Sequence, residues 1–509
     1  MKILVIQLAR LGDIYQSWPA LRALRRQHAG AEIHVAARSR YAVALEGLEA
    51  IDKVHTLESA NLFAPYLNES LGAEADAESG LSEQDDAALQ ELSNFVDALE
   101  GESFDWIINM SFSPASADLT YILANGAAEA GREIKASGYT RHADGHLNLP
   151  DAMSAYFFAQ VGYQRPNRFH LCEIFGTLCE VDLLPQDWKG PSTPVAEQAA
   201  SVLQSLPTEY IAIHIGGSEE HKRISVSKWI SVLKHLRGLR PFKFVVLGAG
   251  NEFDRGESLK SVAPEGEVIN LAGQIDLRAC FEVIKNAQIL IGPDSAPIHM
   301  ASLVGTACLN LSLGQVNYWE TGPRAAFSVV LRATDESDLL SDVIGDRVVA
   351  MIHGQRYPLG TIESQPGTPS YTGGTATEDD FLWSFCMAIY QGTDFPAPYD
   401  HLFEEGIKQL SDVNHFMMEQ MESVSTTQEL KDRSGLLQRG EEIIEAVGKL
   451  VPSLVPLVRW YQTEKVRIGP ASLGEILTKN METQRLLQGV LNLYLPPEEA
   501  GAVMEGEAL

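Results

Sequence analysis

The sequence predicts an α/β protein with two open, doubly wound domains followed by a helical region. Short aliphatic and β-branched runs, such as residues 3–6 and 289–291, have the composition of parallel strands that are buried on both faces. Amphipathic stretches with helical spacing separate these runs, which indicates alternating strand–helix units. Past residue 335 the strand pattern gives way to helical spacing that continues to about residue 496.

The composition limits the number of domains and the kinds of partner. A chain of 509 residues is long enough for two or three domains, and 45% hydrophobic residues can form a sizeable core. The formal net charge is −29, from 68 acidic and 39 basic residues, which argues against nucleic acid or an anionic membrane as a partner of the whole surface. A local basic cleft is compatible with this charge.

The cysteines and the apolar runs indicate the cellular compartment. The five cysteines are scattered and include no C-x-x-C pair, so a structural zinc site or a disulfide framework is disfavoured and a reducing compartment is favoured. The N-terminal apolar run is too short for a signal peptide, and no apolar run reaches transmembrane length. We expect a cytoplasmic protein, with peripheral attachment at the inner membrane left open.

The first domain is expected to span residues 1–190, because a proline-rich break follows at residues 185–194. An acidic stretch rich in Ala, Ser and Glu interrupts this domain at about residues 58–102. We interpret it as a partly helical, partly mobile insertion at the sheet edge. The predicted strands are residues 3–6, 31–36 and 106–109, and the predicted helices are residues 14–28 and 41–48.

The second domain is expected at residues 191–335, facing the first domain across a cleft. Ligands of open α/β sheets bind beyond the carboxyl ends of the strands, so the loops after the strands are the first place to search for a site. Residues 336–509 are predicted to form a loop-rich and then helical extension that packs on the body, on a partner protein or on a second copy. The predicted strands are residues 210–215, 244–247, 268–271, 289–291 and 307–311, and the helices are residues 229–239 and 277–286.

The segment I-L-I-G-P-D-S-A-P-I-H-M-A-S, residues 289–302, reads as a strand, a polar turn and the start of a helix. Asp294 and Ser295 precede Pro297 in N-cap position, and His299 falls in the first helical turn. A helix N-terminus beside a strand end is a ready anion site, because free N–H groups and the helix dipole favour negative charge there. From this segment alone, a purely structural interpretation is equally favoured. In it, Asp294 and Ser295 only cap the helix, and His299 only packs against neighbouring side chains.

Two glycine-rich turns and a basic cluster lie in the same domain. Gly217 and Ser218 would let the backbone approach a phosphate, although neither a dinucleotide-binding fingerprint nor a P-loop is present. Lys222, in the run H-K-R, could neutralise a diphosphate, although exposed basic clusters are usually only solvated. Glu252, after a second Gly-rich turn, could accept hydrogen bonds from sugar or ribose hydroxyls.

The loop after the first strand carries a candidate general base. Asp13 follows Gly12 and could take a proton from an acceptor hydroxyl, whereas its position alone slightly favours helix capping. Arg10 could bind an anionic ligand on the acceptor side or pair with Asp13.

Segments of residues 1–330 follow the pattern of a known family. In G-P-D-S-A-P-I-H-M-A-S-L-V-G-T, Asp294, Ser295, Ala296 and His299 take the places of the Asp, Thr, Gly and His of a D-T-G-x-x-H-x-A donor loop. L-A-R-L-G-D-I-Y-Q-S-W-P-A-L is similar to the opening G-D-x-x-x-x-x-P-A-L, with Asp13 on its base. The chain thereby resembles the heptosyltransferase-type glycosyltransferases, glycosyltransferase family 9, which have the GT-B architecture.

Two more segments extend the resemblance, and two positions depart from it. H-K-R-I-S-V-S-K-W is similar to the family segment that begins K-x-W-P and places Lys222 on the lysine that holds the donor phosphates. L-A-G-Q-I-D-L-R-A-C-F is similar to the segment that contacts adenine. Ile224-Ser225 stands where the family has Trp-Pro, and Ala296 stands where the donor loop has glycine.

The resemblance implies an inverting, metal-independent transfer of heptose or a related sugar from an ADP-linked donor. Asp13 would deprotonate the acceptor hydroxyl, while Lys222, Gly217 and Ser218 would stabilise the departing diphosphate together with the helix after Asp294. No metal site and no cofactor beyond the nucleotide-sugar co-substrate is expected, since the cleft loops contain no D-x-D cluster.

The sequence leaves alternatives open for the acceptor and for catalysis itself. A glycan, a lipopolysaccharide-type molecule or a protein could accept the sugar, and the net charge of −29 disfavours an anionic acceptor unless a basic face is kept. A non-catalytic relative that binds nucleotide sugar and scaffolds a glycosylation complex is the main alternative, motivated by Ala296 and Ile224. A sugar-nucleotide epimerase would need further carboxylates and a histidine around the sugar, which the sequence does not reveal.

Overall fold

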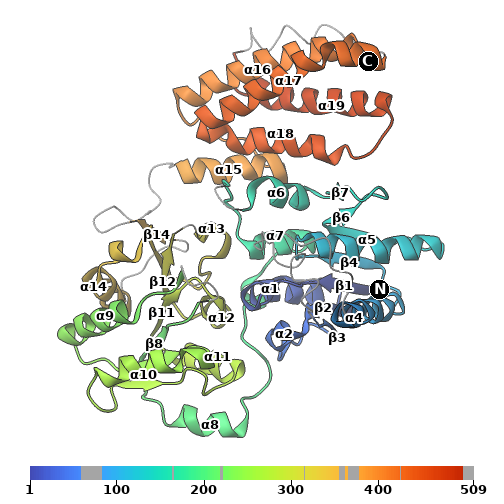
Figure 1. Ribbon diagram of the computed structural model, residues 1–509. Helices are drawn as coiled ribbons and strands as arrows, with labels where there is room; N and C mark the ends of the chain where they lie inside the picture. Colours follow the sequence, from blue (N-terminus) through green and yellow to red (C-terminus); the bar gives the residue numbers. More distant parts are fainter. Residues whose placement is uncertain are drawn as a thin grey trace. The chain divides into compact units, whose positions relative to one another are not determined.

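The computed structural model divides into two compact units, which are described separately (Figure 1). Unit 1 contains Met1–Ala115, Leu123–Lys135 and Phe169–Gly374, and unit 2 contains Ser116–Ile122, Ala136–Arg168 and Thr375–Leu509. The structure describes residues 1–58, 83–162, 165–217, 222–314, 316–354, 361–364, 378–424 and 426–496.

The first sheet has the strand order β3-β2-β1-β4-β5, and β1 pairs in parallel with β2 and β4. Residues 3–6 of β1 are fully buried, as expected of a central parallel strand. The chain order reverses between β1 and β4, so their carboxyl ends flank the crevice in which such sheets bind ligands. The strands are β1 (Lys2–Ile6), β2 (Glu32–Arg38), β3 (Lys53–Leu57), β4 (Trp106–Asn109) and β5 (Lys135–Gly138).

One of the two helices predicted in the first domain is present, and further helices were not predicted. α1 (Leu11–Gln27) follows β1 as expected, but the helix predicted at residues 41–48 is wrong, because the chain forms only α2 (Ser39–Ala42) and a 3₁₀ turn. In the predicted acidic insertion, α4 (Glu83–Glu100) is helical and residues 59–82 lie outside the described residues. The other helices before the second sheet are α5 (Pro114–Glu129), α6 (Ala152–Gln160), α7 (Leu171–Leu178) and α8 (Glu197–Gln204).

The second sheet is parallel throughout, in the order β10-β9-β8-β11-β12-β13-β14. All five strands predicted in this domain are present with ends shifted by at most two residues. The strands are β8 (Ile211–His214), β9 (Phe244–Leu247), β10 (Val268–Asn270), β11 (Ile289–Pro293), β12 (Cys308–Leu313), β13 (Val329–Ala333) and β14 (Thr361–Ser364). The helices are α9 (Val226–Leu239), α10 (Phe253–Ser261), α11 (Leu277–Asn286), α12 (Ala296–Val304), α13 (Tyr318–Thr321) and α14 (Ser341–Ile352).

The second domain continues past the boundary predicted at residue 335. β14 extends the sheet beyond β13, and Ile344 and Val348 of α14 are buried in the same core as α9. The expectation that residues 336–364 belong to the extension is therefore wrong. Strands β13 and β14 are short and separated by a helix and loops, so neither produced a periodic pattern clear enough to read.

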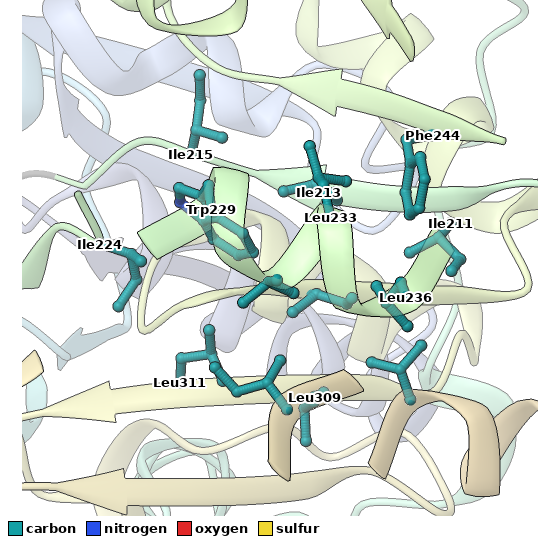
Figure 2. Close-up of a cluster of buried hydrophobic side chains, with 14 of the residues drawn as sticks. Ile211, Ile213, Ile215, Ile224, Trp229, Leu233, Leu236, Phe244, Leu309 and Leu311 are labelled. Atoms are coloured by element: carbon teal, nitrogen blue, oxygen red, sulfur yellow. The ribbon is translucent and has the colours of Figure 1, made fainter. Parts of the chain in front are cut away.

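The core of the second domain forms where α9 covers one face of the sheet (Figure 2). Trp229, Leu233 and Leu236 of α9 pack against strand residues such as Ile213 and Phe244. Ile224, where the resembling family has tryptophan, is also fully buried in this cluster. The departure from the family pattern thus lies in the core that anchors the segment around Lys222.

Unit 2 combines the C-terminal helices with a segment from the first half of the chain. α6 packs against α18, and Gln160 Nε2 donates to Tyr390 Oη at 2.8 Å and to the carbonyl oxygen of Pro456 at 2.9 Å. The predicted boundary at residue 190 had placed residues 136–168 in the first domain, but these residues belong to unit 2. The other elements of unit 2 are a short hairpin, β6 (Thr140–Arg141) and β7 (Leu147–Asn148), and the helices α15 (Glu378–Gln391), α16 (His401–Glu422), α17 (Thr427–Leu450), α18 (Val455–Arg467) and α19 (Leu473–Asn492).

Helicity between residues 378 and 496 agrees with the prediction for the C-terminal region. Among the described helices, none is both long enough and apolar enough to cross a membrane.

The core of α9 gives a matched test of the packing. Leu233→Ala removes a side chain that is 2% exposed and should cost about 2–5 kcal/mol of unfolding free energy, because a cavity remains. Leu239→Ala, at the end of the same helix and 46% exposed, should change it by less than about 0.5 kcal/mol. Urea unfolding of the two variants measures the contrast, and equal losses would contradict the burial of α9 described above.

Candidate active site

The N-termini of α1 and α12 meet at the edge of the two sheets in unit 1. A Cβ atom on Gly12, the second residue of α1, would lie 3.0 Å from His299 Cδ2 and 3.8 Å from Cα of Ala296, the first residue of α12. Only glycine permits this approach without a shift. Both helix dipoles present their positive ends here, so the junction favours negative charge.

Aromatic packing and hydrogen bonds hold the two domains at this junction. Tyr15 and Trp18 of α1 contact Phe281 of α11, with ring centroids 5.2 and 5.8 Å apart. Arg22, 6% exposed, donates from Nη2 to the carbonyl oxygen of Gly190 in the interdomain segment at 3.0 Å. The position of α1 against the second domain is therefore fixed along several turns of the helix.

Asp13 lies in the first turn of α1 and beside cations. The N-cap residue of α1 is Arg10 and not Asp13, because the helix begins three residues earlier than predicted; Asp13 is its third residue, and its Oδ2 accepts the backbone N–H of Arg10 at 3.1 Å. The side chain is partly exposed, yet the surrounding protein desolvates the carboxylate and raises its pKa, while Arg10 and then Lys222 act to lower it. A carboxylate with a raised pKa is a stronger base than an ordinary aspartate, which suits proton abstraction.

Lys222 links Asp13 to the donor loop of the second domain. Its Nζ lies 3.9 Å from Asp294 Oδ2, and the Asp294 side chain is 8% exposed. Ser295 is the N-cap residue of α12 but makes no side-chain capping bond; its Oγ donates instead to the carbonyl oxygen of Pro293 at 3.0 Å. The α12 N-terminus is thus not closed by its own cap residue, in contrast to the simple capping interpretation.

His299 is buried against Gly12 and is electrically neutral. Burial lowers its pKa to about 3, and the nearby Lys222 cation contributes to the shift. A neutral imidazole in this place can donate or accept one hydrogen bond without adding positive charge to a site that already holds Lys222.

The Gly-rich turns take different places in the site. The carbonyl oxygen of Gly217 accepts from Arg223 Nε at 2.9 Å, and Ser218 lies outside the described residues. Glu252 is 5% exposed, and its Oε2 accepts the N–H of Ala249 at 2.8 Å. Its carboxylate fills the space that a side chain at Gly216 or Gly248 would need.

His214, at the end of β8, is buried beside this carboxylate. Burial lowers the His214 pKa to about 4, and Glu252 opposes that shift. The structure therefore places Glu252 against the strand ends, whereas it brings Asp13, Lys222, Asp294, Ala296 and His299 together, with Arg10 and Gly12 alongside.

Sequence reasoning missed Arg38, a buried cation close enough to Asp13 to interact with it electrostatically. Arg38 ends β2 at 6% exposure, and its guanidinium lies 4.7 Å from the ring centroid of Tyr41, over which Arg40 also lies at 5.3 Å. Arg38 Nε is buried without a hydrogen-bond partner; burial lowers the pKa of Arg38, the Arg10 cation adds to this shift, and the Asp13 carboxylate opposes it. The R-S-R run at the end of a predicted strand was the available signal.

Residues 93–337 match the sequence model of glycosyltransferase family 9, described as heptosyltransferase. The chain carries a glycosyltransferase family 9 domain. The protein is thus a glycosyltransferase, and its two parallel sheets with flanking helices agree with the GT-B architecture expected from the resemblance. The matched segment contains Lys222, Asp294 and His299, and it begins after Asp13 and Arg38.

Solved structures resemble the region that holds the family 9 domain. The *E. coli* ADP-heptose lps heptosyltransferase II is 16% identical, with 69% of this chain and 99% of that chain covered and a TM-score of 0.47. A family 9 glycosyl transferase from Veillonella parvula has 16% identity, coverage of 69% and 97%, and a TM-score of 0.49. The *E. coli* heptosyltransferase WaaC with ADP has 15% identity, coverage of 69% and 100%, and a TM-score of 0.47. A search of curated protein sequences gives no significant match.

In the part of the chain that the structure describes, the one group of three side chains placed to hold a metal ion lies away from the candidate active site, at His34, His55 and Glu102. The expectation of metal-free chemistry therefore stays a prediction, and the residues gathered near Asp13 supply positive charge through Lys222 and two helix N-termini.

Asp13→Asn should stabilise the protein at neutral pH while it abolishes transfer. The carboxyl pKa is raised on folding, so the ionised form costs stability above its ordinary pKa, and that cost is relieved as the pH falls. The difference in melting temperature between variant and wild type should therefore be largest at neutral pH and should shrink in acid. A destabilised variant at neutral pH would contradict the raised pKa.

Gly12→Ala should weaken activity through the contact with His299. The added Cβ would lie 3.3 Å from His299 Nε2, so α1, α12 or the imidazole must shift by tenths of an ångström. Gly30→Ala is the matched control, because nothing lies within 4 Å of its added Cβ. Steady-state kinetics should show a loss of kcat/KM of about tenfold or more for the first variant and none for the second.

Proposed function

We propose that the protein is an inverting, metal-independent glycosyltransferase that moves heptose or a related sugar from an ADP-linked donor. The observation that carries the proposal is the meeting of Asp13 with Lys222, Asp294 and His299 where two helix N-termini converge. A base from one domain and cationic groups from the other are what such a transfer needs on opposite sides of the anomeric carbon.

In the proposed reaction, Asp13 takes the proton of the acceptor hydroxyl. The hydroxyl oxygen forms a bond to the anomeric carbon while the bond from that carbon to the diphosphate breaks on the opposite face, which inverts the configuration. The proton stays on the Asp13 carboxylate, and the nucleoside diphosphate leaves with the electron pair. The raised pKa of Asp13 strengthens the base, while Arg10 and Lys222 help to keep it ionised.

Positive charge for the leaving group comes from Lys222 and the α12 N-terminus. Lys222 supplies a full charge near Asp294, and α12 adds backbone N–H groups and the positive end of its dipole. These groups can perform the charge stabilisation that a metal ion supplies in other transferases. The description of the family supports a heptose donor, and the segment at residues 271–281, which resembles the family's adenine-contacting stretch, supports an ADP moiety.

The acceptor in this proposal carries an anionic group near the reacting hydroxyl. Arg38 is a buried cation with an unpartnered Nε next to the base, and Arg40 lies over the same tyrosine ring. A carboxylate or phosphate on the acceptor would satisfy that donor and offset the charge. This feature is the local basic face that an anionic acceptor needs on a chain with a net charge of −29.

Nucleotide titration tests the donor site. Calorimetry with ADP, UDP and GDP should show preference for ADP, and Lys222→Ala should weaken ADP binding by about 10- to 100-fold, the value of a hydrogen bond to a charged group. Lys234→Ala removes an exposed lysine of α9 and should leave the affinity unchanged. If no nucleotide binds, the transferase proposal fails; if ADP binds but no sugar is transferred, a scaffolding relative is indicated.

Acceptor preference tests the role of Arg38. Transfer from ADP-heptose should be faster to sugars with a carboxylate or phosphate than to their neutral counterparts, and Arg38→Gln should remove this preference by raising the acceptor KM. Arg132→Gln, an exposed position in the same unit, is the charge-matched control and should keep the preference. Equal rates with charged and neutral acceptors in the wild type would exclude an anionic acceptor.

A further inference from the structure

Two buried histidines lie on neighbouring strands of the first sheet, outside the candidate active site. His34 on β2 is fully buried and His55 on β3 is 8% exposed, with His34 Nδ1 3.0 Å from His55 Nε2. Glu102 follows α4, and its carboxylate completes a group whose ligand atoms all lie within 4.8 Å of one another. We propose that His34, His55 and Glu102 bind one divalent transition-metal ion, with zinc as the favoured member of that class.

The hydrogen bond on the far side of His34 fixes its tautomer for metal binding. His34 Nε2 lies 2.8 Å from Glu32 Oε1, and a carboxylate can only accept, so Nε2 carries the hydrogen. Nδ1 is then left with its lone pair and faces His55. A histidine that donates one ring N–H to a carboxylate and offers the other nitrogen is the usual arrangement in metal sites, where the carboxylate orients the ring and raises its basicity.

The ligand types and spacings fit a four-coordinate ion with one open position. Zinc–nitrogen bonds of about 2.0–2.1 Å in a tetrahedron separate two nitrogens by about 3.3 Å, close to the 3.0 Å between His34 and His55. Two imidazoles and one carboxylate are ligands that zinc accepts, with water as the fourth. The ring of Phe104, T-shaped against His34 at 5.3 Å, shields the site on an apolar side.

Two lysines compete with the ion for Glu102. Lys2 Nζ lies 2.7 Å from Glu102 Oε2 and 3.4 Å from Glu32 Oε2, and Lys53 pairs with Glu102 Oε1. A carboxylate has about four lone-pair positions, so Glu102 can keep a lysine contact while it coordinates a metal. Lys53 is half-exposed and can turn toward water, so its competition is the weaker constraint and can be removed by substitution.

The ion would stabilise the folded protein and take no part in transfer, since none of its ligands belongs to the groups near Asp13. It would join β2 and β3 to Glu102, which follows α4 at the end of the predicted acidic insertion. A metal that binds only the folded form stabilises it by mass action.

Calorimetric titration of the metal-free full chain with Zn²⁺ tests this site, and Co²⁺ serves as an absorbing probe of coordination. One ion per chain should bind, with the strong visible absorption of four-coordinate cobalt. His55→Gln removes a ligand. Glu32→Gln changes a half-exposed position that the fold tolerates, and this variant should weaken binding by about 10- to 100-fold. Lys53→Gln should tighten it, because a competing cation is gone.

His401→Gln is the control for adventitious binding. His401 is 80% exposed and lies 3.6 Å from Glu404 and 3.2 Å from Glu405, so it is a natural surface site for zinc. The proposal expects one-to-one binding to survive this substitution. Three outcomes would each overturn the proposal. The first is the absence of stoichiometric binding to the wild type, and the second is loss of binding in His401→Gln. The third is unchanged affinity in both Glu32→Gln and Lys53→Gln.

Discussion

The approach of two helix N-termini, at Gly12 of α1 and Ala296 of α12, is the constraint on which the site depends. Two positive dipole ends repel each other, and Lys222 adds a full positive charge to the same place. Asp13 and Asp294 offset part of this charge from the two sides. An anion bound between the helices would complete the compensation, so the requirement for negative charge is already present in the arrangement of the backbone.

This constraint also explains why the residues at the helix contact itself, Gly12, Ala296 and His299, are small or neutral. Glycine at position 12 permits the contact, and a neutral His299 adds no charge beside Lys222. Alanine at position 296, where the resembling family has glycine, lies at the start of α12, and its Cα is 3.8 Å from the Cβ that Gly12 would carry. Further bulk on either helix end would push the two domains apart.

Local patterns were sufficient to predict most strands and the loop after β11. β8 to β12 and the donor loop after β11 were readable because each strand is a continuous apolar run and the loop has helix-start signals. The pairing of Asp13 with the donor loop came from the family resemblance and could not be read from spacing, because residues some 280 positions apart share no periodic signal. Arg38 escaped notice for a related reason: its role depends on burial, and an R-S-R run alone reads as a solvated surface.

The division of the chain between the two units was not visible in the sequence. α6 has its partners in α15 and α18, about 230 to 300 residues later, and Gln160 is satisfied there by Tyr390 and Pro456. During synthesis, the buried face of α6 therefore emerges long before the helices that cover it. At about 5–20 residues per second, its partners in α18 follow roughly 15–60 s later. For that interval the apolar face of α6 and the Gln160 side chain lack the partners that cover them in the folded chain.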